Sequence, residues 1–302
     1  HDKVTKPRMI IKLAQHFGLC FGVRDAINEA ERLATHAPLT ILGELVHNPV
    51  VQEELRQRGV RHASLDDVGA ANTPQVMITA HGASDRAREA WRKAGFGVAD
   101  GTCPLVRHAH DQLKLLVDLG YFPIVIGKPG HVEVAGLTGD FPGAVVIEGM
   151  SDLGRIPRAP RLGIISQTTQ PIIHVQELVG AIREMHPLSE VRFIDTVCQP
   201  TKRRQSALAA LLSECDTIVV VGGRHSNNTL ELVRSARAAG RRVHHVQSAS
   251  ELDPTWFTGN ETVGITAGTS TLHETVAAVQ RRLETIAGEF AAEAADDRQV
   301  AK

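Results

Sequence analysis

The sequence predicts an α/β protein made of three related units with mainly parallel sheets. Two observations support this class. Short apolar runs rich in Val and Ile alternate with amphipathic helical patterns along the whole chain, which is typical of βαβ units. Three sequence signals also recur in the same order at matched spacing, which indicates an internal repeat.

The apolar runs are predicted to be strands because each is short and ends in Gly, Ala or polar residues. They cover residues 9–14, 40–43, 75–80, 122–127, 144–148, 161–166, 191–196, 217–223, 241–246 and 263–268. The clearest helical patterns lie between them, at residues 22–36, 107–120, 176–186 and 202–214. These runs are too many for one small sheet.

The repeat is marked by three cysteines, each followed after 23 or 24 residues by a glycine that ends a strand. The cysteines are Cys20, Cys103 and Cys198, and the glycines are Gly43, Gly127 and Gly222. Four residues after each glycine comes a polar residue: His47, His131 or Ser226. Each unit later ends a strand in a related tetrapeptide, ITAH (78–81), ISQT (165–168) or ITAG (265–268). We therefore predict three α/β units, at 1–96, 97–190 and 191–302, the last including the C-terminal tail.

Ligands of parallel α/β sheets bind beyond the carboxyl ends of the strands, and all of these signals lie at such ends. Three units arranged around a pseudo-threefold axis would bring the three cysteines to one centre. The polar residues predicted to ring that centre are His47, His81, His131, Thr168, Ser226 and Ser270.

Three matched thiols suit an iron–sulfur cluster with one open iron, or a zinc ion completed by His or water. Structural zinc more often uses paired ligands in one knuckle, so cysteines from three units favour the cluster. Each cysteine precedes a predicted helix, whose N-terminal dipole favours a thiolate. The fourth cysteine, Cys215, has no matched position and is interpreted as a small buried hydrophobe.

The polar residues at the strand ends suit a phosphate, because hydroxyls, amides, imidazoles and helix N-termini bind that group. Helix capping is the alternative for Ser226 and Ser270. Glu133 follows His131 by two residues and begins a helix. It either complements the helix dipole or delivers a proton to a leaving hydroxyl. Thr168 would relay that proton or fix the hydroxyl, and the other histidines, such as His110, are interpreted as incidental.

Composition excludes several classes of function. The chain has 302 residues, a formal net charge of -1 and 4% aromatic residues, so it lacks the basic and stacking surfaces of a nucleic-acid-binding protein. Its four cysteines are far apart, unlike those of a secreted disulfide framework. No apolar run is long enough to span a membrane, and the amino end lacks the apolar core of a signal peptide. We expect a cytoplasmic protein.

Together these motifs resemble one family, the 4-hydroxy-3-methylbut-2-enyl diphosphate reductases of the non-mevalonate isoprenoid pathway. The resemblance spans nearly the whole chain and rests on GLCFGVRDAI, GELVHNPVV, ITAHG, DGTCPLV, GHVEVAG, SQTTQ, DTVCQPT, GGRHSNN and TAGTS. It implies a trefoil of three α/β units around a [4Fe-4S] cluster. It also implies reductive dehydroxylation of an allylic alcohol diphosphate to isopentenyl and dimethylallyl diphosphate, with two electrons from a donor such as ferredoxin or flavodoxin.

The resemblance also implies a role for each matched residue. Cys20, Cys103 and Cys198 would hold the cluster and leave its apical iron open. The residues implied to bind the diphosphate are His47, His81, His131, Ser226, Asn227, Asn228 and Ser270. Thr168 would contact the substrate hydroxyl and Glu133 would supply protons.

The sequence departs from the family pattern at four positions, Val132, Pro200, Asn227 and Leu272. Asn227 stands where the family usually has a second serine. Two alternatives therefore stay open. One is a related cluster enzyme acting on a different allylic diphosphate, and the other is a non-catalytic iron–sulfur sensor or binding protein.

Overall fold

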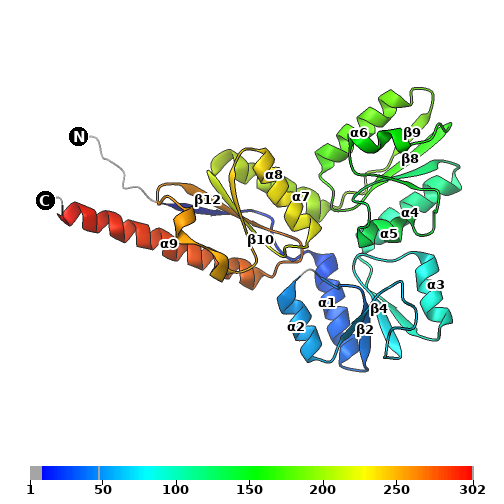
Figure 1. Cartoon of the computed structure of the whole chain (residues 1–302), viewed down its shortest axis with the longest axis horizontal. Coiled ribbons are helices and arrows are strands. Elements are labelled where there is room, and N and C mark those ends of the chain that lie inside the picture. The colour runs from blue at the N-terminus through cyan, green and yellow to red at the C-terminus, as the bar shows by residue number, and fades with distance from the viewer. Residues whose placement is uncertain (1–8, 47, 301–302) are drawn as a thin grey trace. The chain divides into compact units, whose positions relative to one another are not determined.

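The computed structural model describes residues 9–46 and 48–300, except the side chains of residues 296–300. The described residues form three four-stranded sheets, and every pair of neighbouring strands is parallel (Figure 1). Helices connect the strands, as crossovers between parallel strands require. The predicted α/β class with mainly parallel sheets is confirmed.

The first sheet has the strand order β3-β2-β4-β5. Its strands are β2 (Leu39–Leu42), β3 (Arg61–Ala63), β4 (Gln75–Ile78) and β5 (Gly97–Asp100). The connecting helices are α1 (Phe21–Ala34), α2 (Pro49–Gln57) and α3 (Asp85–Lys93). The strands β3 and β5 lie outside the predicted runs, because they are short and carry few large apolar residues.

The second sheet has the equivalent order β7-β6-β8-β9. Its strands are β6 (Phe122–Ile126), β7 (Val145–Ile147), β8 (Arg161–Ser166) and β9 (Glu190–Phe193). The helical segments are α4 (Pro104–Asp118), α5 (Val132–Thr138), α6 (Ile172–Met185) and the 3₁₀ turn η1 (Met150–Arg155).

The third sheet has the order β1-β12-β10-β11. Its strands are β1 (Ile10–Leu13), β10 (Thr217–Val221), β11 (Arg242–Val246) and β12 (Thr262–Ala267). The helical segments are α7 (Gln199–Glu214), α8 (Asn227–Ala238), α9 (His273–Val300) and the 3₁₀ turns η2 (Ala249–Glu251) and η3 (Pro254–Trp256).

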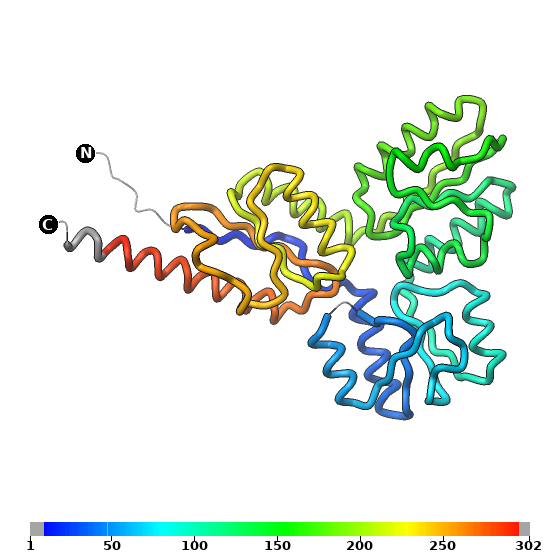
Figure 2. The backbone as a smooth tube through the Cα atoms, in the orientation of Figure 1, coloured from blue at the N-terminus to red at the C-terminus, as the bar shows by residue number. Residues whose placement is uncertain are grey.

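The strand β1 completes the repeat from the opposite end of the chain. It pairs with β12 in a register that runs from Ile10 opposite Thr262 to Leu13 opposite Ile265. Figure 2 shows this N-terminal segment, in blue, among the yellow and orange segments of the third sheet. Its place beside β12 is the one that β5 takes beside β4 in the first sheet and β9 beside β8 in the second. The sequence analysis placed β1 in the first α/β unit, and the pairing assigns it to the third sheet instead. The chain continues from β12 into α9, so the open edge of that sheet is filled by the N-terminal strand.

The same repeat shifts the predicted boundaries. The strand β5 begins at the predicted start of the second unit, and β9 begins one residue before that of the third, yet both pair with strands of the preceding sheet. Each structural repeat therefore begins at a cysteine and ends with the strand before the next cysteine.

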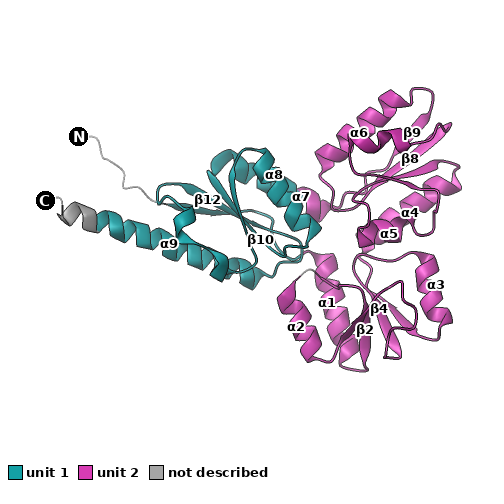
Figure 3. Cartoon of the chain, in the orientation of Figure 1, with its two compact units in different colours: residues 1–19, 203–302 teal, residues 20–202 magenta. Residues whose placement is uncertain are grey.

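The chain divides into two compact units (Figure 3). We call residues 20–202 the middle unit and the described parts of residues 1–19 and 203–302 the terminal unit. The middle unit contains the first and second sheets, and the terminal unit contains the third. The central strands are buried along their length, as in parallel sheets covered by helices on both faces.

Cys215 lies in the core of the terminal unit. It is buried in a cluster with Leu211, Ile218 and other apolar residues of α7, α8 and β10. The interpretation of this cysteine as core filling is confirmed. In the described part of the chain, no helix combines the length and the apolar character needed to cross a membrane.

Candidate active site

All three matched cysteines lie in the middle unit, each immediately before a helix. Cys20 precedes α1, Cys103 precedes α4 and Cys198 precedes α7. Pro104 occupies the first position of α4, where no N–H donor is needed. The prediction that each cysteine opens a helix is therefore confirmed.

Cys103 is held by a network of buried polar groups around the turn after β5. Its backbone N–H donates to Ala80 O at 3.0 Å. Asp100 Oδ1 accepts from the backbone N–H of Thr102 at 3.0 Å, and Arg88 Nη2 donates to Thr102 Oγ1 at 3.1 Å. Burial raises the pKa of Asp100, but hydrogen bonds from Thr102 and Arg107 and the charge of Arg88 outweigh it and lower this pKa to about 2. This turn therefore has a fixed conformation.

The other two cysteines are fixed by close backbone contacts. A Cβ built on Gly22, two residues after Cys20, would overlap Cys103 Sγ, so the first turn of α1 lies directly against Cys103. The backbone N–H of Cys198 donates to Thr168 O at 2.9 Å. Cys198 Sγ lies 3.1 Å from Thr201 Oγ1.

Burial raises the pKa of Cys103 and raises that of Cys198 to about 11. The backbone N–H groups of Leu105 and Val106 lower the pKa of Cys103, as expected at a helix start, but burial outweighs them. The start of the helix thus favours the thiolate, as expected, but for these two groups burial has the larger and opposite effect. The charges of Cys20 and Glu133 raise both pKa values further, so these two groups lie within electrostatic range of both Cys103 and Cys198.

This donor set fits an iron–sulfur cluster. All three thiols are free of disulfides, and the only other cysteine of the chain is in the apolar core of the terminal unit. Thiolates buried this way need a positive charge beside them, and a bound metal supplies that charge as the protons leave. Three thiols leave one corner of a four-iron cluster without a cysteine ligand.

Glu133 is the buried acid of the site. It lies in the first turn of α5 and is 2% exposed. The backbone N–H of Thr168 donates to Glu133 Oε1 at 2.6 Å, and the Thr168 side chain also hydrogen-bonds to Glu133. Burial raises the pKa of Glu133 to about 7 against the effect of these hydrogen bonds. A carboxyl group with this pKa can both donate and accept a proton near neutral pH.

Two predicted phosphate ligands lie beside this acid. His131 caps α5, and its Nδ1 accepts the backbone N–H of Glu133 at 3.1 Å. In the neutral ring, Nε2 therefore carries the proton. The rings of His131 and His81 meet edge to face, with centroids 5.7 Å apart. The structure thus brings together His81, His131, Glu133 and Thr168, whereas His47 lies outside the described residues.

The remaining predicted ligands lie in the terminal unit, at the carboxyl ends of β10 and β12. Ser226 caps α8, and its Oγ accepts the backbone N–H of Thr229 at 3.4 Å. Asn228 Oδ1 accepts the backbone N–H of Thr269 at 3.1 Å, which joins this helix start to the loop that contains Ser270. Ser226, Asn227, Asn228 and Ser270 are all buried. Part of the role of Ser226 is the capping that the sequence analysis offered as an alternative.

The sequence analysis did not single out Arg88 or Asp100, the two charged residues that fix the turn before Cys103. Arg88 is 7% exposed, which is rare for an arginine unless it is paired. The sequence of this helix, DRAREAWRK, gives no sign that Arg88 is buried, because most of its residues are charged and look alike in the sequence.

Comparisons with known proteins agree on one family. The family model described as LytB protein matches residues 11–284. A protein of Aquifex aeolicus named 4-hydroxy-3-methylbut-2-enyl diphosphate reductase is 34% identical over 282 residues, covering 91% of this chain and 96% of its own. A protein of the same name from Geotalea daltonii is 36% identical over 282 residues, covering 92% and 98%.

Two solved structures share the fold. The E-1-hydroxy-2-methyl-but-2-enyl-4-diphosphate reductase from Plasmodium falciparum has a TM-score of 0.83 at 27% identity, covering 92% of this chain and 88% of its own. An (E)-4-hydroxy-3-methyl-but-2-enyl diphosphate reductase, described as the terminal enzyme of the non-mevalonate pathway, has a TM-score of 0.66 at 33% identity, covering 92% and 100%. The match over almost the full length shows that this chain belongs to the LytB protein family.

Proposed function

We propose that this chain is a 4-hydroxy-3-methylbut-2-enyl diphosphate reductase. The substrate takes up two electrons and two protons, its allylic C–O bond breaks, and water leaves with isopentenyl or dimethylallyl diphosphate as the product. The observation that carries the proposal is the buried Glu133, hydrogen-bonded to Thr168 and within electrostatic range of the thiols of Cys103 and Cys198. An acid placed beside a metal-binding donor set is what reductive loss of a hydroxyl group requires.

Cys20, Cys103 and Cys198 would hold a [4Fe-4S] cluster through their thiolates and leave its apical iron open. When bound, the cluster would supply the two electrons and a Lewis-acidic iron for the hydroxyl oxygen. Electrons would come from a small donor such as ferredoxin or flavodoxin, and we expect the reaction to take place in the cytoplasm.

Glu133 and Thr168 would manage the protons. A large fraction of Glu133 keeps its proton near neutral pH because its pKa is about 7, and the hydroxyl of Thr168 would orient the substrate hydroxyl toward it. Protonation of the leaving oxygen turns a poor leaving group into water. Protonation of carbon at one or other end of the allylic unit decides which of the two products forms.

The remaining residues would bind the diphosphate. His81 and His131 offer imidazole groups in the middle unit, and His47 is proposed with them. In the terminal unit, Ser226, Asn227, Asn228 and Ser270 offer hydroxyl and amide donors at the start of α8 and at the end of β12. Such groups at a helix N-terminus bind anionic oxygens well.

The test is turnover by anaerobically purified protein loaded with iron and sulfide and supplied with a chemical reductant. We expect conversion of 4-hydroxy-3-methylbut-2-enyl diphosphate to both products. Glu133→Gln should keep the iron content and lower turnover by about 10²- to 10⁴-fold. Glu177→Gln, which alters an exposed carboxylate of α6, is the matched control and should match the wild type.

Three results would contradict the proposal. Turnover of a different allylic diphosphate alone would indicate a related enzyme. A cluster-loaded protein without turnover, with Glu133→Gln identical to the wild type, would indicate a sensor. Zinc in a colourless protein would exclude the cluster.

A further inference from the structure

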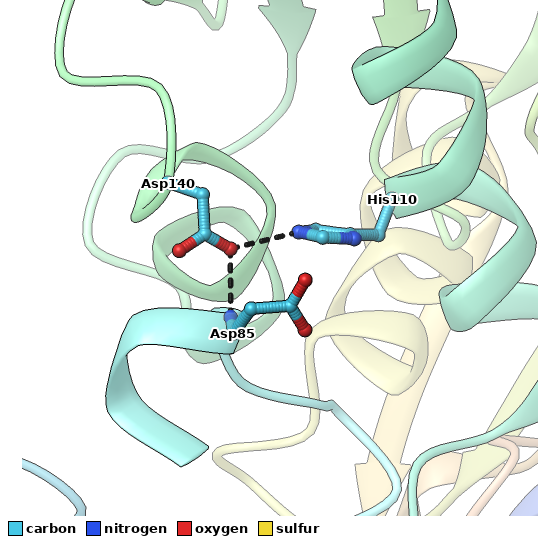
Figure 4. A group of neighbouring side chains, drawn as sticks. All are labelled: Asp85, His110 and Asp140. Carbon is cyan, nitrogen blue, oxygen red and sulfur yellow. Dashed lines mark hydrogen bonds and ion pairs between the residues drawn. The ribbon is translucent and has the colours of Figure 1, made fainter. Parts of the chain in front are cut away.

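Asp140 connects three helices that each begin close to a proposed site residue. Figure 4 shows its contacts with Asp85 and His110. Asp140 follows the C-terminal end of α5, the helix that contains Glu133. Its carboxylate contacts the start of α3, which begins four residues after His81, and a side chain of α4, which begins directly after Cys103. From the sequence alone His110 is interpreted as incidental, but the structure gives it a buried partner in Asp140.

The first contact is a helix cap supplied from a distant part of the chain. Asp140 Oδ2 accepts the backbone N–H of Asp85 at 2.7 Å, and Oδ1 accepts that of Arg86 at 3.0 Å. Ser84 Oγ accepts the next backbone N–H, from Ala87, at 3.1 Å. The first amides of a helix have no partner inside the helix, so Asp140 provides two of the acceptors that α3 needs.

The second contact comes from α4. His110 Nε2 donates to Asp140 Oδ2 at 3.0 Å, and both side chains are largely buried. Burial raises the pKa of Asp140, but hydrogen bonds from the backbone of Arg86 and Asp85 and from His110 outweigh it, so this pKa is lowered. The carboxylate is therefore ionised when it makes these contacts.

The helix α5 depends on such contacts because it has only seven residues. A helix of two turns is not stable by itself in water, so packing decides where it lies. A Cβ built on Gly136 would lie 3.3 Å from Ala83 Cα, and one built on Gly139 would lie 2.7 Å from Ser84 Cβ. The helix is thus pressed against the segment that follows His81.

A bound cation is the other explanation for the group of Asp85, His110 and Asp140, whose ligand atoms lie within 4.8 Å of one another. The hydrogen bonds argue against it. Both oxygens of Asp140 already accept backbone N–H groups, and the side chain of Asp85 is 71% exposed. The group is a hydrogen-bonded clamp between three helices.

We propose that Asp140 is a positioning residue that, with His110, fixes Glu133 and His131 on α5 relative to His81 and Cys103. The inference rests on the proposed function, because it predicts where the proton of Glu133 is delivered. If α5 shifts, the carbon that receives the proton changes, and the ratio of isopentenyl to dimethylallyl diphosphate changes with it. This ratio does not depend on how much of the protein is folded, so a purely structural role would leave it unaltered.

The main variant is Asp140→Asn, which keeps the size of the side chain but replaces one acceptor oxygen with an N–H donor. We expect kcat per loaded cluster to fall by about 10-fold or more, since small displacements of reacting groups have large effects. We also expect a changed product ratio. In metal-free protein, the amides of residues 85–86 and 132–138 should exchange hydrogen about 10-fold faster than in the wild type.

The matched control is Asp152→Asn. The Asp152 carboxylate also accepts two backbone N–H groups, from Glu148 at 2.8 Å and Gly149 at 3.1 Å. It lies in η1, which contains none of the proposed site residues. This variant should keep the wild-type kcat, product ratio and exchange in α5.

Variants of His110 test the clamp from its other side if Asp140→Asn does not fold. His110→Leu removes the donor and should change the product ratio in the same direction. His110→Gln keeps an N–H donor and should restore the wild-type ratio.

A wild-type product ratio with wild-type exchange in α5, in Asp140→Asn or in His110→Leu, would overturn the proposal. Equal losses of kcat in Asp140→Asn and Asp152→Asn at an unchanged ratio would do the same. The hydrogen-exchange measurement needs no turnover, so it tests by itself whether Asp140 and His110 hold α5 in place. A wild type that forms neither product would contradict the proposed function, but the hydrogen-exchange result on the clamp would remain valid.

Discussion

The middle and terminal units place different chemistry at equivalent strand ends. The position four residues after the strand-ending glycine is His131 in the second repeat and Ser226 in the third. The last residue of the tetrapeptide is Thr168 in the second and Gly268 in the third. Ionisable groups thus gather in the middle unit, beside the thiols, while the third repeat keeps neutral hydroxyls and amides. In the proposed function, one backbone plan would serve proton transfer in one unit and anion binding in the other.

The two units also hold these groups in different ways. The middle unit uses charged side chains, such as Arg88, in its ion pair with Asp100, and Asp140, whose carboxylate accepts backbone N–H groups at the start of α3. The terminal unit uses close packing around glycine. A Cβ built on Gly268 would overlap Thr229 Oγ1, and Gly222 has a φ of +150° that other residues rarely adopt. In the proposed site, polar networks would fix directional contacts to the reacting groups, whereas close packing would place no charge near the bound anion.

The largest effect should come from the thiols, because all three proposed metal ligands lie in the middle unit. Cys103→Ser replaces a metal-binding thiolate with a hydroxyl, and we expect bound iron and turnover both to be lost. Cys215→Ser alters a buried cysteine of the terminal unit and should keep both, with stability lowered by about 1–3 kcal/mol. Iron analysis and urea unfolding check this. Equal loss of iron in both variants would contradict the assignment of Cys103 to the metal site and of Cys215 to the core.

The next effect is a pH dependence specific to the middle unit. Glu133 loses its proton at about pH 4.5 when unfolded and at about pH 7 when folded. Between these values only the unfolded state releases the proton, so the free energy of unfolding falls as pH rises, by about 1.4 kcal/mol per unit and about 3 kcal/mol in all. Urea unfolding of metal-free protein at pH 5 and pH 8 measures this change in the free energy of unfolding.

Glu133→Gln removes this titration, so its stability relative to the wild type should increase between pH 5 and pH 8. The exposed Glu177→Gln should follow the wild type at both values. A difference between Glu133→Gln and the wild type that stays constant with pH would show that the carboxyl group titrates normally.

A smaller effect should come from a charge placed among the neutral donors of the terminal unit. Asn228→Asp keeps the oxygen that accepts from Thr269 but replaces the amide donor with a negative charge. We expect KM for the diphosphate to rise by about 10- to 100-fold, the loss of a hydrogen bond to a charged group, with kcat nearly unchanged. Asn260→Asp, in an exposed loop before β12, is the control. A fall in kcat at constant KM would place Asn228 in the chemical step instead.

The smallest effect concerns packing in the terminal unit. Gly268→Ala should lower stability by about 1–3 kcal/mol, because its Cβ would overlap Thr229. Adding Thr229→Ala removes the overlapping oxygen and should recover part of the loss. Gly288→Ala, in α9 with nothing within 4 Å of the new Cβ, should raise stability by about 1 kcal/mol. Thermal unfolding compares them, and an additive double variant would show that the two residues do not interact.

Much of the fold followed from local pattern. Val- and Ile-rich runs predicted the central strands of all three sheets, because strands buried on both faces must be apolar along their length. The edge strands β3 and β5 were not predicted, because Arg61–Ala63 and Gly97–Asp100 have little apolar surface to bury. For the site, matched spacing pointed to Cys20, Cys103 and Cys198 as a set. The spacing of the repeated motifs did not predict the burial of Arg88 or the contacts of Asp140 with α3 and α4.

By itself, the sequence determined the α/β class, the threefold repeat and the residue types at each strand end, because periodicity and composition are local properties of a chain. Only the tertiary structure decided that β1 completes the third sheet and that burial raises the pKa of Glu133 to about 7. It also decided that Asp140 caps a helix that begins 55 residues earlier in the chain. These features depend on contacts between segments far apart in the sequence. Such contacts form only when the chain folds, and they produce the strand pairing and the burial.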